Sequence, residues 1–104
     1  MKSINAIIAL KEVKTDLDRS ESFYEIQESG IGKYFRDCII SDMESLYLYA
    51  GIHEKYLDTY KLLSKRFPYA VYYIIKDHTV IVVAVLDMRR NPSSINRQLR
   101  QRDF

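Results

Sequence analysis

Two long β-rich runs separated by a short turn constrain the fold of this chain more than any other feature. Residues 69–76 and 79–87 are dense in Val, Ile and Tyr, which are residue types that favour strands. Lys76-Asp77-His78 lies at their junction and has the polar character of a turn. The sequence therefore predicts a β-hairpin in the last third of the chain.

Arginine residues stand at both ends of this hairpin. Arg66 precedes the first strand, and Arg89 and Arg90 follow the second. Guanidinium groups bind carboxylate and phosphate groups through paired hydrogen bonds, so a stiff sheet that carries them suits an anionic partner. The alternative is that these charges only protect a sheet edge from aggregation.

The first half of the chain predicts two helices. After a short strand at residues 3–9, apolar residues recur at three- and four-residue steps from Leu10, which predicts a helix of about 17 residues. Its acidic side chains, Asp16 among them, are expected mostly on the outer side. Gly30 is a natural C-terminal cap for this helix. A second helix follows at residues 35–50, and so short a connection predicts an antiparallel helical hairpin.

The remaining segments complete one domain over residues 1–104. We expect a loop at residues 52–59 and a strand at residues 60–67, which ends before Pro68. The order strand, helix, helix, strand, strand, strand predicts an α+β fold, with the helical hairpin on one face of an antiparallel sheet. From about residue 93 the chain is a basic tail, either disordered when free or a short helix capped by Ser93 or Ser94.

Charge is distributed unevenly along the chain. Residues 1–60 carry 7 Lys and Arg against 11 Asp and Glu, whereas residues 61–104 carry 9 against 3. This asymmetry indicates an anionic partner for the C-terminal half, unless the two halves attract each other within the monomer.

Cysteine and histidine usage bounds the chemistry. Cys38 is the single cysteine, so no internal disulfide forms, and we expect a reducing cytoplasm and a small buried side chain there. His53 and His78 are far apart and have no cysteine beside them, which argues against a zinc site. No apolar run approaches the roughly 20 residues of a membrane span.

Candidate site residues cluster around the hairpin. Tyr69 and Tyr73 share one face of their strand and Tyr72 takes the other. Tyr72 and Tyr73 are expected to pack in the core, whereas Tyr69, at the start of the strand, either packs or stacks on a nucleobase. Asp87 is expected to be a surface carboxylate, or alternatively to orient Arg89. The chain contains no recognisable catalytic frame of Ser, His and Asp.

These residues together resemble a known family. The order helix, Gly-Ile-Gly, helix, then Arg-Phe-Pro-Tyr-Ala-Val-Tyr-Tyr at 66–73 and Arg-Arg-Asn-Pro at 89–92, is similar to the RelE/ParE superfamily of bacterial type II toxins. The resemblance implies a cognate antitoxin that neutralises the toxin in a hetero-oligomer. RelE-like members cut mRNA on the ribosome, and ParE-like members poison DNA gyrase.

The departures from the nuclease pattern favour the ParE-like branch. Tyr69 stands where nuclease members carry a sheet arginine, and Ser93 and Ser94 stand where they carry a late Tyr or His. The chain also departs from the ParE-like pattern at one position, because many ParE-like relatives carry a His where Asp87 stands. The resemblance therefore implies a gyrase poison that needs no cofactor and no metal. The alternatives are a ribosome-dependent mRNA endoribonuclease or a degenerate toxin that only binds antitoxin.

Under either activity the same surface carries the function. The residues expected to bind the target are Lys65, Arg66, Tyr69, Asp87, Arg89, Arg90 and Arg97. In the nuclease alternative the catalytic set is Arg66, Tyr69, Arg89 and Arg90.

Overall fold

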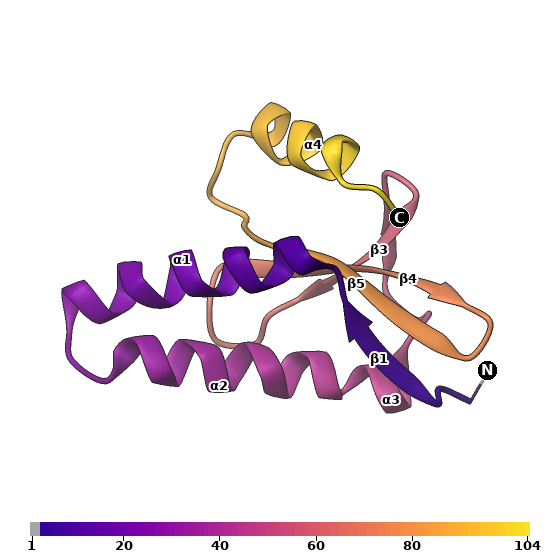
Figure 1. The fold of residues 1–104 in the computed structure, drawn as a ribbon, viewed down its shortest axis with the longest axis horizontal. Coiled ribbons are helices and arrows are strands. Elements are labelled where there is room, and N and C mark those ends of the chain that lie inside the picture. The colour runs from indigo at the N-terminus through magenta and orange to yellow at the C-terminus, as the bar shows by residue number, and fades with distance from the viewer. Residues whose placement is uncertain (1–2) are drawn as a thin grey trace.

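The computed structural model describes residues 3–104 and consists of one mixed sheet with helices on both faces (Figure 1). This arrangement confirms the predicted α+β class. No helix in the described range is both long and apolar enough to cross a membrane. The elements in chain order are β1 (Ala6–Ala9), α1 (Lys11–Gln27), α2 (Ile31–Glu44), α3 (Leu46–Tyr49), β2 (Glu54–Tyr56), β3 (Thr59–Leu63), β4 (Tyr69–Lys76), β5 (Thr79–Asp87) and α4 (Pro92–Gln101).

The five strands lie in the order β1-β5-β4-β3-β2, and the predicted hairpin of β4 and β5 lies inside the sheet. β4 and β5 pair antiparallel from Tyr69 and Asp87 at one end to Lys76 and Thr79 at the other. β1 lies on the free edge of β5 and runs parallel to it. The sheet is therefore mixed rather than wholly antiparallel, because the two helices return the chain to the far edge before the next strand begins.

The segment expected to be a loop contains a short strand. β2 pairs antiparallel with β3 across a tight turn at Leu57 and Asp58, whose φ angles are 44° and 63°. The Thr59 hydroxyl donates to the carbonyl of Tyr56 at 2.5 Å and closes the turn. Tight hairpin turns of this kind usually contain Asn or Gly, so Leu57 does not predict a turn. β3 also ends earlier than expected, at Leu63.

The helical hairpin covers one face of the sheet, as predicted. Val13 and Leu17 of α1 and Phe35 and Ile39 of α2 are buried against strand side chains that include Tyr73. The second helix is shorter than expected, because a turn at Ser45 separates α2 from α3. The Ser45 hydroxyl donates to the carbonyl of Asp42 at 2.6 Å, a side-chain bond of the kind that competes with helix continuation.

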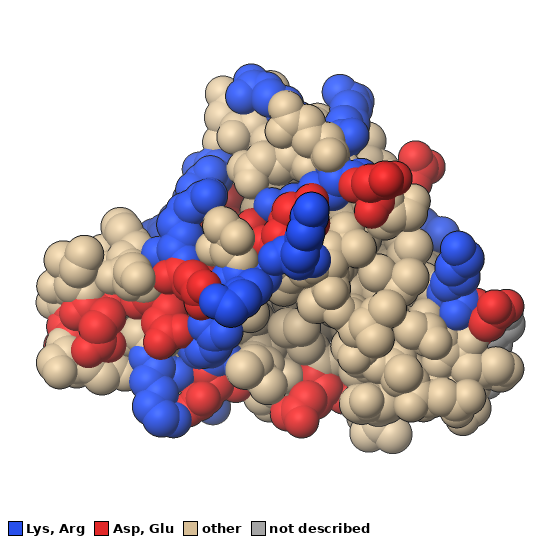
Figure 2. Space-filling model, viewed as in Figure 1, with Lys and Arg blue, Asp and Glu red and all other residues tan. Residues whose placement is uncertain are grey.

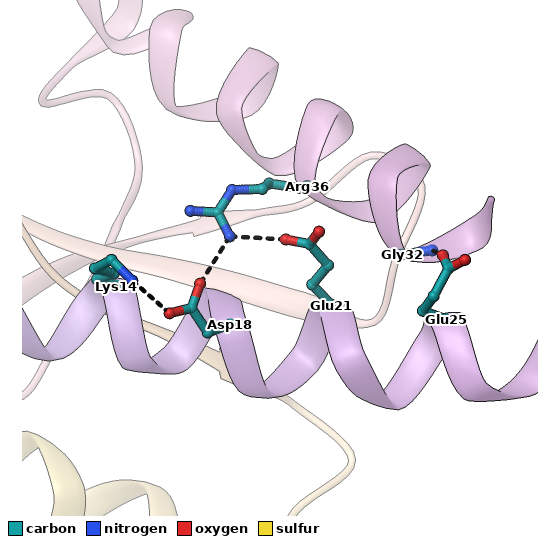
Figure 3. A network of polar contacts seen from close by, with 6 residues as sticks. All are labelled: Lys14, Asp18, Glu21, Glu25, Gly32 and Arg36. Carbon is teal, nitrogen blue, oxygen red and sulfur yellow. Dashed lines mark hydrogen bonds and ion pairs between the residues drawn. The ribbon is translucent and has the colours of Figure 1, made fainter. Parts of the chain in front are cut away.

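Acidic side chains of α1 hold the hairpin together (Figure 3). The Glu25 carboxylate accepts the backbone N–H groups of Gly30 and Gly32, each at 2.9 Å. Arg36 of α2 donates to Glu21 at 2.7 Å and to Asp18 at 3.0 Å. Part of the acidic surplus of the first half is thus used within the hairpin.

The basic tail forms a helix on the opposite face of the sheet from the helical hairpin (Figure 1). Ile95 and Leu99 of α4 are buried against a cluster that contains Tyr72. Its N-cap is Asn91, not Ser93 or Ser94, because the Asn91 side chain accepts the Ser93 N–H at 2.8 Å and Pro92 occupies the first helical position.

Asp16 is buried rather than on the outer side of α1. Both of its carboxylate oxygens accept from the Arg102 guanidinium, at 2.6 and 2.7 Å, and one also accepts the Val85 N–H at 3.0 Å. Arg102 donates further to the carbonyl of Val83 at 3.0 Å. This ion pair connects the end of α4 to α1 and β5. One arginine of the basic tail is therefore buried in the monomer and is not available to a partner.

We predict that Gly32→Ala destabilises the protein. A Cβ at this position would lie 2.6 Å from the backbone carbonyl oxygen of Glu21, which cannot move without shifting α1. We expect a loss of about 1–3 kcal/mol in the free energy of unfolding, measured by urea denaturation. Ser22→Ala, on the exposed face of α1, is the control and should change it by less than about 0.5 kcal/mol. Equal stability of the two variants would contradict this packing.

We predict that Arg102→Met is more damaging than the loss of a surface charge. It leaves the Asp16 carboxylate buried without its cation, which costs about 3–5 kcal/mol of unfolding free energy. The double variant Asp16→Asn/Arg102→Met removes the orphaned charge and should recover part of that loss in the same urea experiment. A double variant no more stable than Arg102→Met would show that the charge itself is not the cause.

Candidate functional site at the end of the sheet

The start of β4 and the end of β5 meet at one end of the sheet. Tyr69 and Asp87 are partners in the β4–β5 register, and the Met88 N–H donates to the carbonyl of Pro68 at 2.8 Å. The segment that follows Asp87 is therefore anchored where it leaves the sheet. Figure 2 shows that Lys and Arg side chains form a band that runs from beside α4 down across the helical hairpin, with acidic side chains beside them.

Arg89 is held in place by Asp87. Its Nε and Nη2 donate to the two carboxylate oxygens at 3.0 and 2.8 Å, and its backbone N–H donates to the same group at 2.9 Å. Burial alone would raise the pKa of Asp87, but the hydrogen bonds from Arg89 outweigh it and lower that pKa. The hydrogen bonds to Asp87 raise the pKa of Arg89. Asp87 thus orients Arg89, as the alternative interpretation held, while the Arg89 side chain stays 57% exposed.

Tyr69 is a core residue and offers no free ring face for stacking. Its ring centroid lies 4.8 Å from that of Phe35, and its hydroxyl donates to Ser20 Oγ at 3.0 Å. Burial raises the pKa of Tyr69, although the hydrogen bond to Ser20 opposes part of the shift. The expected face sharing is confirmed, since Tyr69 and Tyr73 belong to the cluster under the helical hairpin and Tyr72 belongs to the other.

Lys65 and Arg66 line a different cavity from Arg90. Both are exposed in the β3–β4 connection, where they line a cavity of about 200 Å³ with Cys38 and Asp42 of α2. Cys38 is half-buried rather than fully buried. The predicted surface is therefore two basic sites, one beside α2 and one beside α1.

Arg97 lines neither of the two cavities that define these basic sites. It is exposed on α4, while its neighbour Gln98 lines a narrow cavity together with Arg90 and Asp87. Arg97 thus stays a prediction as a target-binding residue, carried by the helix that flanks the site.

Three residues of α1 complete the site, and the sequence analysis missed them. Arg19, Ser20 and Phe23 line a cavity of about 240 Å³ together with Tyr69, Asp87 and Arg90. Ser20 follows Leu17 by three positions on the buried stripe of α1. A buried hydroxyl group needs a hydrogen-bond partner, so a serine on the apolar stripe of α1 could have indicated a polar contact at this position.

The histidines lie away from this end of the sheet. His53 Nδ1 is 2.5 Å from the Tyr73 hydroxyl, and burial lowers the pKa of this histidine. His78 Nδ1 is 2.7 Å from the carbonyl of Ser3. Residues 3–104 contain no group of three or more His, Cys, Asp or Glu placed to hold a metal ion.

The fold and the site define a class: a small α+β protein whose helical hairpin covers one sheet face and whose last strand ends in arginines. A family model described as the ParE toxin of the parDE type II toxin-antitoxin system matches residues 7–92. The chain therefore belongs to the ParE toxin family.

A comparison with solved structures agrees with this fold. A chain described as "Chromosomal ParDE TA system from P. aeruginosa" is similar, with a TM-score of 0.72 and 13% sequence identity over 81% of this chain and 96% of that one. At this identity the likeness concerns the fold alone. A comparison with curated proteins gives no match.

We predict that Arg89→Met raises the pKa of Asp87, measured by carbon-13 NMR of its carboxyl group. In the intact protein this pKa lies below the unfolded value of 3.8, so the ion pair stabilises the folded state above pH 3.8 and the contribution is lost as pH falls through the lowered pKa. Arg90→Met is the control and should raise the pKa less, because Arg90 acts only through its charge. Equal rises in the two variants would show that Arg89 is not the specific partner.

Proposed function

We propose that this chain is the growth-inhibiting component of a type II toxin–antitoxin pair and that it poisons DNA gyrase in the cytoplasm until a cognate antitoxin neutralises it. The observation that carries the proposal is the fixed Arg89 beside an unpaired Arg90 at an exposed sheet end. Within residues 3–104, Arg90 makes no side-chain hydrogen bond or ion pair, so its guanidinium is free for a partner.

The Asp87–Arg89 pair suits recognition of a macromolecule. An exposed ion pair contributes little to stability, so its main effect is to fix the direction of the guanidinium. A side chain that is ordered before binding loses less conformational entropy when the partner docks. The rigid β4–β5 hairpin sets the position of this group relative to the rest of the surface.

The geometry gives less support to an mRNA endoribonuclease. Such an enzyme needs a group that exchanges a proton near neutral pH close to the cations that hold the phosphate. Tyr69 is buried, and burial raises its pKa away from neutrality. Arg66 lines a different cavity from Arg90, so the alternative catalytic set is divided between two sites.

The antitoxin has a suitable apolar surface on the α2–α3 side of the molecule. Large apolar side chains are exposed there without a covering element: Ile40, Tyr47, Leu48, Tyr49 and Ile52. Apolar side chains gathered on a surface are typical of protein–protein interfaces. Their position away from the Arg89 end leaves room for separate antitoxin and target contacts.

We predict that Arg89→Ala/Arg90→Ala abolishes toxicity without unfolding the protein. Loss of the fixed guanidinium and its neighbour should raise the toxin concentration needed to trap gyrase-cleaved DNA by about tenfold or more. Lys76→Ala/Arg100→Ala removes two exposed cations elsewhere and should behave like the unmodified toxin. The measurement is a supercoiling and cleavage assay with purified gyrase, accompanied by circular dichroism of each variant.

Three outcomes would contradict this function. Gyrase supercoiling and cleavage that stay unchanged at micromolar unmodified toxin would exclude gyrase as the target. Cleavage of mRNA in the ribosomal A site, detected by primer extension, would establish the endoribonuclease instead. Normal growth on expression of the chain without antitoxin would indicate a degenerate toxin that only binds antitoxin.

A further inference from the structure

The cavity between α1 and the end of the sheet has the chemistry of a carboxylate-binding pocket. Arg19 and Arg90 stand in its wall, and neither side chain makes a hydrogen bond or an ion pair with any residue of the described range 3–104. Asp87 is also in the wall, but both of its oxygens already accept from Arg89. The cavity therefore presents two guanidinium groups that make no direct hydrogen bond or ion pair within residues 3–104, with the Asp87 carboxylate, already held by Arg89, beside them.

A hydroxyl group adds a further donor. Ser20 Oγ accepts the hydrogen bond from the buried Tyr69 hydroxyl, which leaves the proton of Ser20 free to point into the cavity. A carboxylate has two oxygens and accepts about four hydrogen bonds, so it can engage both guanidinium groups and the hydroxyl together.

Beyond Ser20, α1 presents apolar side chains at and beside the cavity. Phe23 lines it and is 50% exposed, and Ile26, one turn further along α1, is 86% exposed. A ligand that fits this surface carries an acidic group next to an apolar one. Acidic and apolar side chains at neighbouring positions of a protein segment have this character.

Size and charge favour a single side chain over a nucleic-acid strand. The cavity, at about 240 Å³, is smaller than the roughly 300–1,000 Å³ of pockets that hold whole small molecules. A polyanionic strand would also place additional phosphates beside the Asp87 carboxylate in the wall. One carboxylate side chain brings a single negative charge near Asp87 instead of several, and it can bind both arginines.

We infer that this cavity binds a Glu or Asp side chain of a partner protein, followed in that segment by an apolar residue that packs on Phe23 and Ile26. The inference rests on the proposed function only for the identity of the partner, which is the target, because Arg90 of this cavity belongs to the end of the sheet proposed to contact it. Arg19 and Arg90 form ion pairs with the carboxylate, the Ser20 hydroxyl donates a hydrogen bond to it, and Phe23 contacts the apolar residue.

The test is a titration of the isotope-labelled full chain with N-acetyl-Glu-Leu-amide, followed by NMR of the arginine Nε–H groups. We expect saturable shifts at Arg19 and Arg90, and binding about tenfold weaker or worse for N-acetyl-Gln-Leu-amide, which has no charge. Arg19→Met/Arg90→Met should lose the binding, whereas Lys76→Met, which removes a distant exposed cation, should keep it.

A second variant keeps the test independent of folding defects. Arg19→Lys/Arg90→Lys preserves the charge but not the guanidinium fork, so it should bind the Glu peptide with intermediate affinity. Equal binding of the Glu and Gln peptides, or absence of saturable shifts at Arg19 and Arg90, would overturn the inference. Tighter binding of a single-stranded oligothymidylate at the same resonances would overturn it in favour of a nucleic-acid site.

The source of the carboxylate is settled with whole partners. If Arg19→Met/Arg90→Met loses gyrase poisoning but still binds antitoxin, the target supplies the side chain. The reverse pattern would overturn that assignment in favour of the antitoxin. A variant that retains both interactions at full strength overturns the inference. Failure of the proposed function is a separate result, because the unmodified chain would then leave gyrase unaffected while it still bound the Glu peptide.

Discussion

The buried ion pair between Asp16 and Arg102 joins three elements of the fold. The carboxylate belongs to α1, the guanidinium follows α4, and the Val85 N–H that completes the site belongs to β5. Both side chains are almost fully buried, so neither charge is tolerated without the other. The pair therefore fixes the position of α1 relative to the end of the sheet.

The functional end of the molecule depends on that position. Arg19 and Ser20 lie one helical turn beyond Asp16, and Asp87 lies two residues beyond Val85 on β5. A shift of α1 along the sheet would separate Ser20 from the Tyr69 hydroxyl and Arg19 from Arg90. The ion pair is thus a structural support for the cavity, although it takes no part in the cavity wall that faces the partner.

The sequence predicted the centre of the fold better than its edges. Residues 69–76 and 79–87 are strongly β-forming and separated by a short turn, so local preference and tertiary pairing agree. β2 escaped prediction because its pairing depends on a turn with positive φ at Leu57, a residue that rarely adopts it. Asp16 was misplaced because its burial is possible only with Arg102, which lies far away in the sequence.

For the candidate site too, the sequence predicted the contacts between residues that are close in the chain but not those between distant ones. Asp87, Arg89 and Arg90 are neighbours in the chain, so their association follows from sequence proximity. Arg19 and Ser20 join them only through the packing of α1 on the sheet, which single-sequence patterns do not reveal. The burial of Tyr69 likewise depends on Phe35 from the second helix.

The charge asymmetry of the chain has a physical meaning that composition alone leaves open. Arg102 forms an ion pair with Asp16, and Arg89 forms one with Asp87. Attraction within the monomer therefore accounts for some of the excess of basic residues in the C-terminal half. Arg19 and Arg90 differ, because neither side chain makes a hydrogen bond or ion pair within residues 3–104, and the Asp87 carboxylate in the same cavity wall is already bound to Arg89. Like charges held close together cost free energy, and an anionic group from outside removes that cost. The unpaired arginines are therefore the part of the basic surface that gains most from a partner.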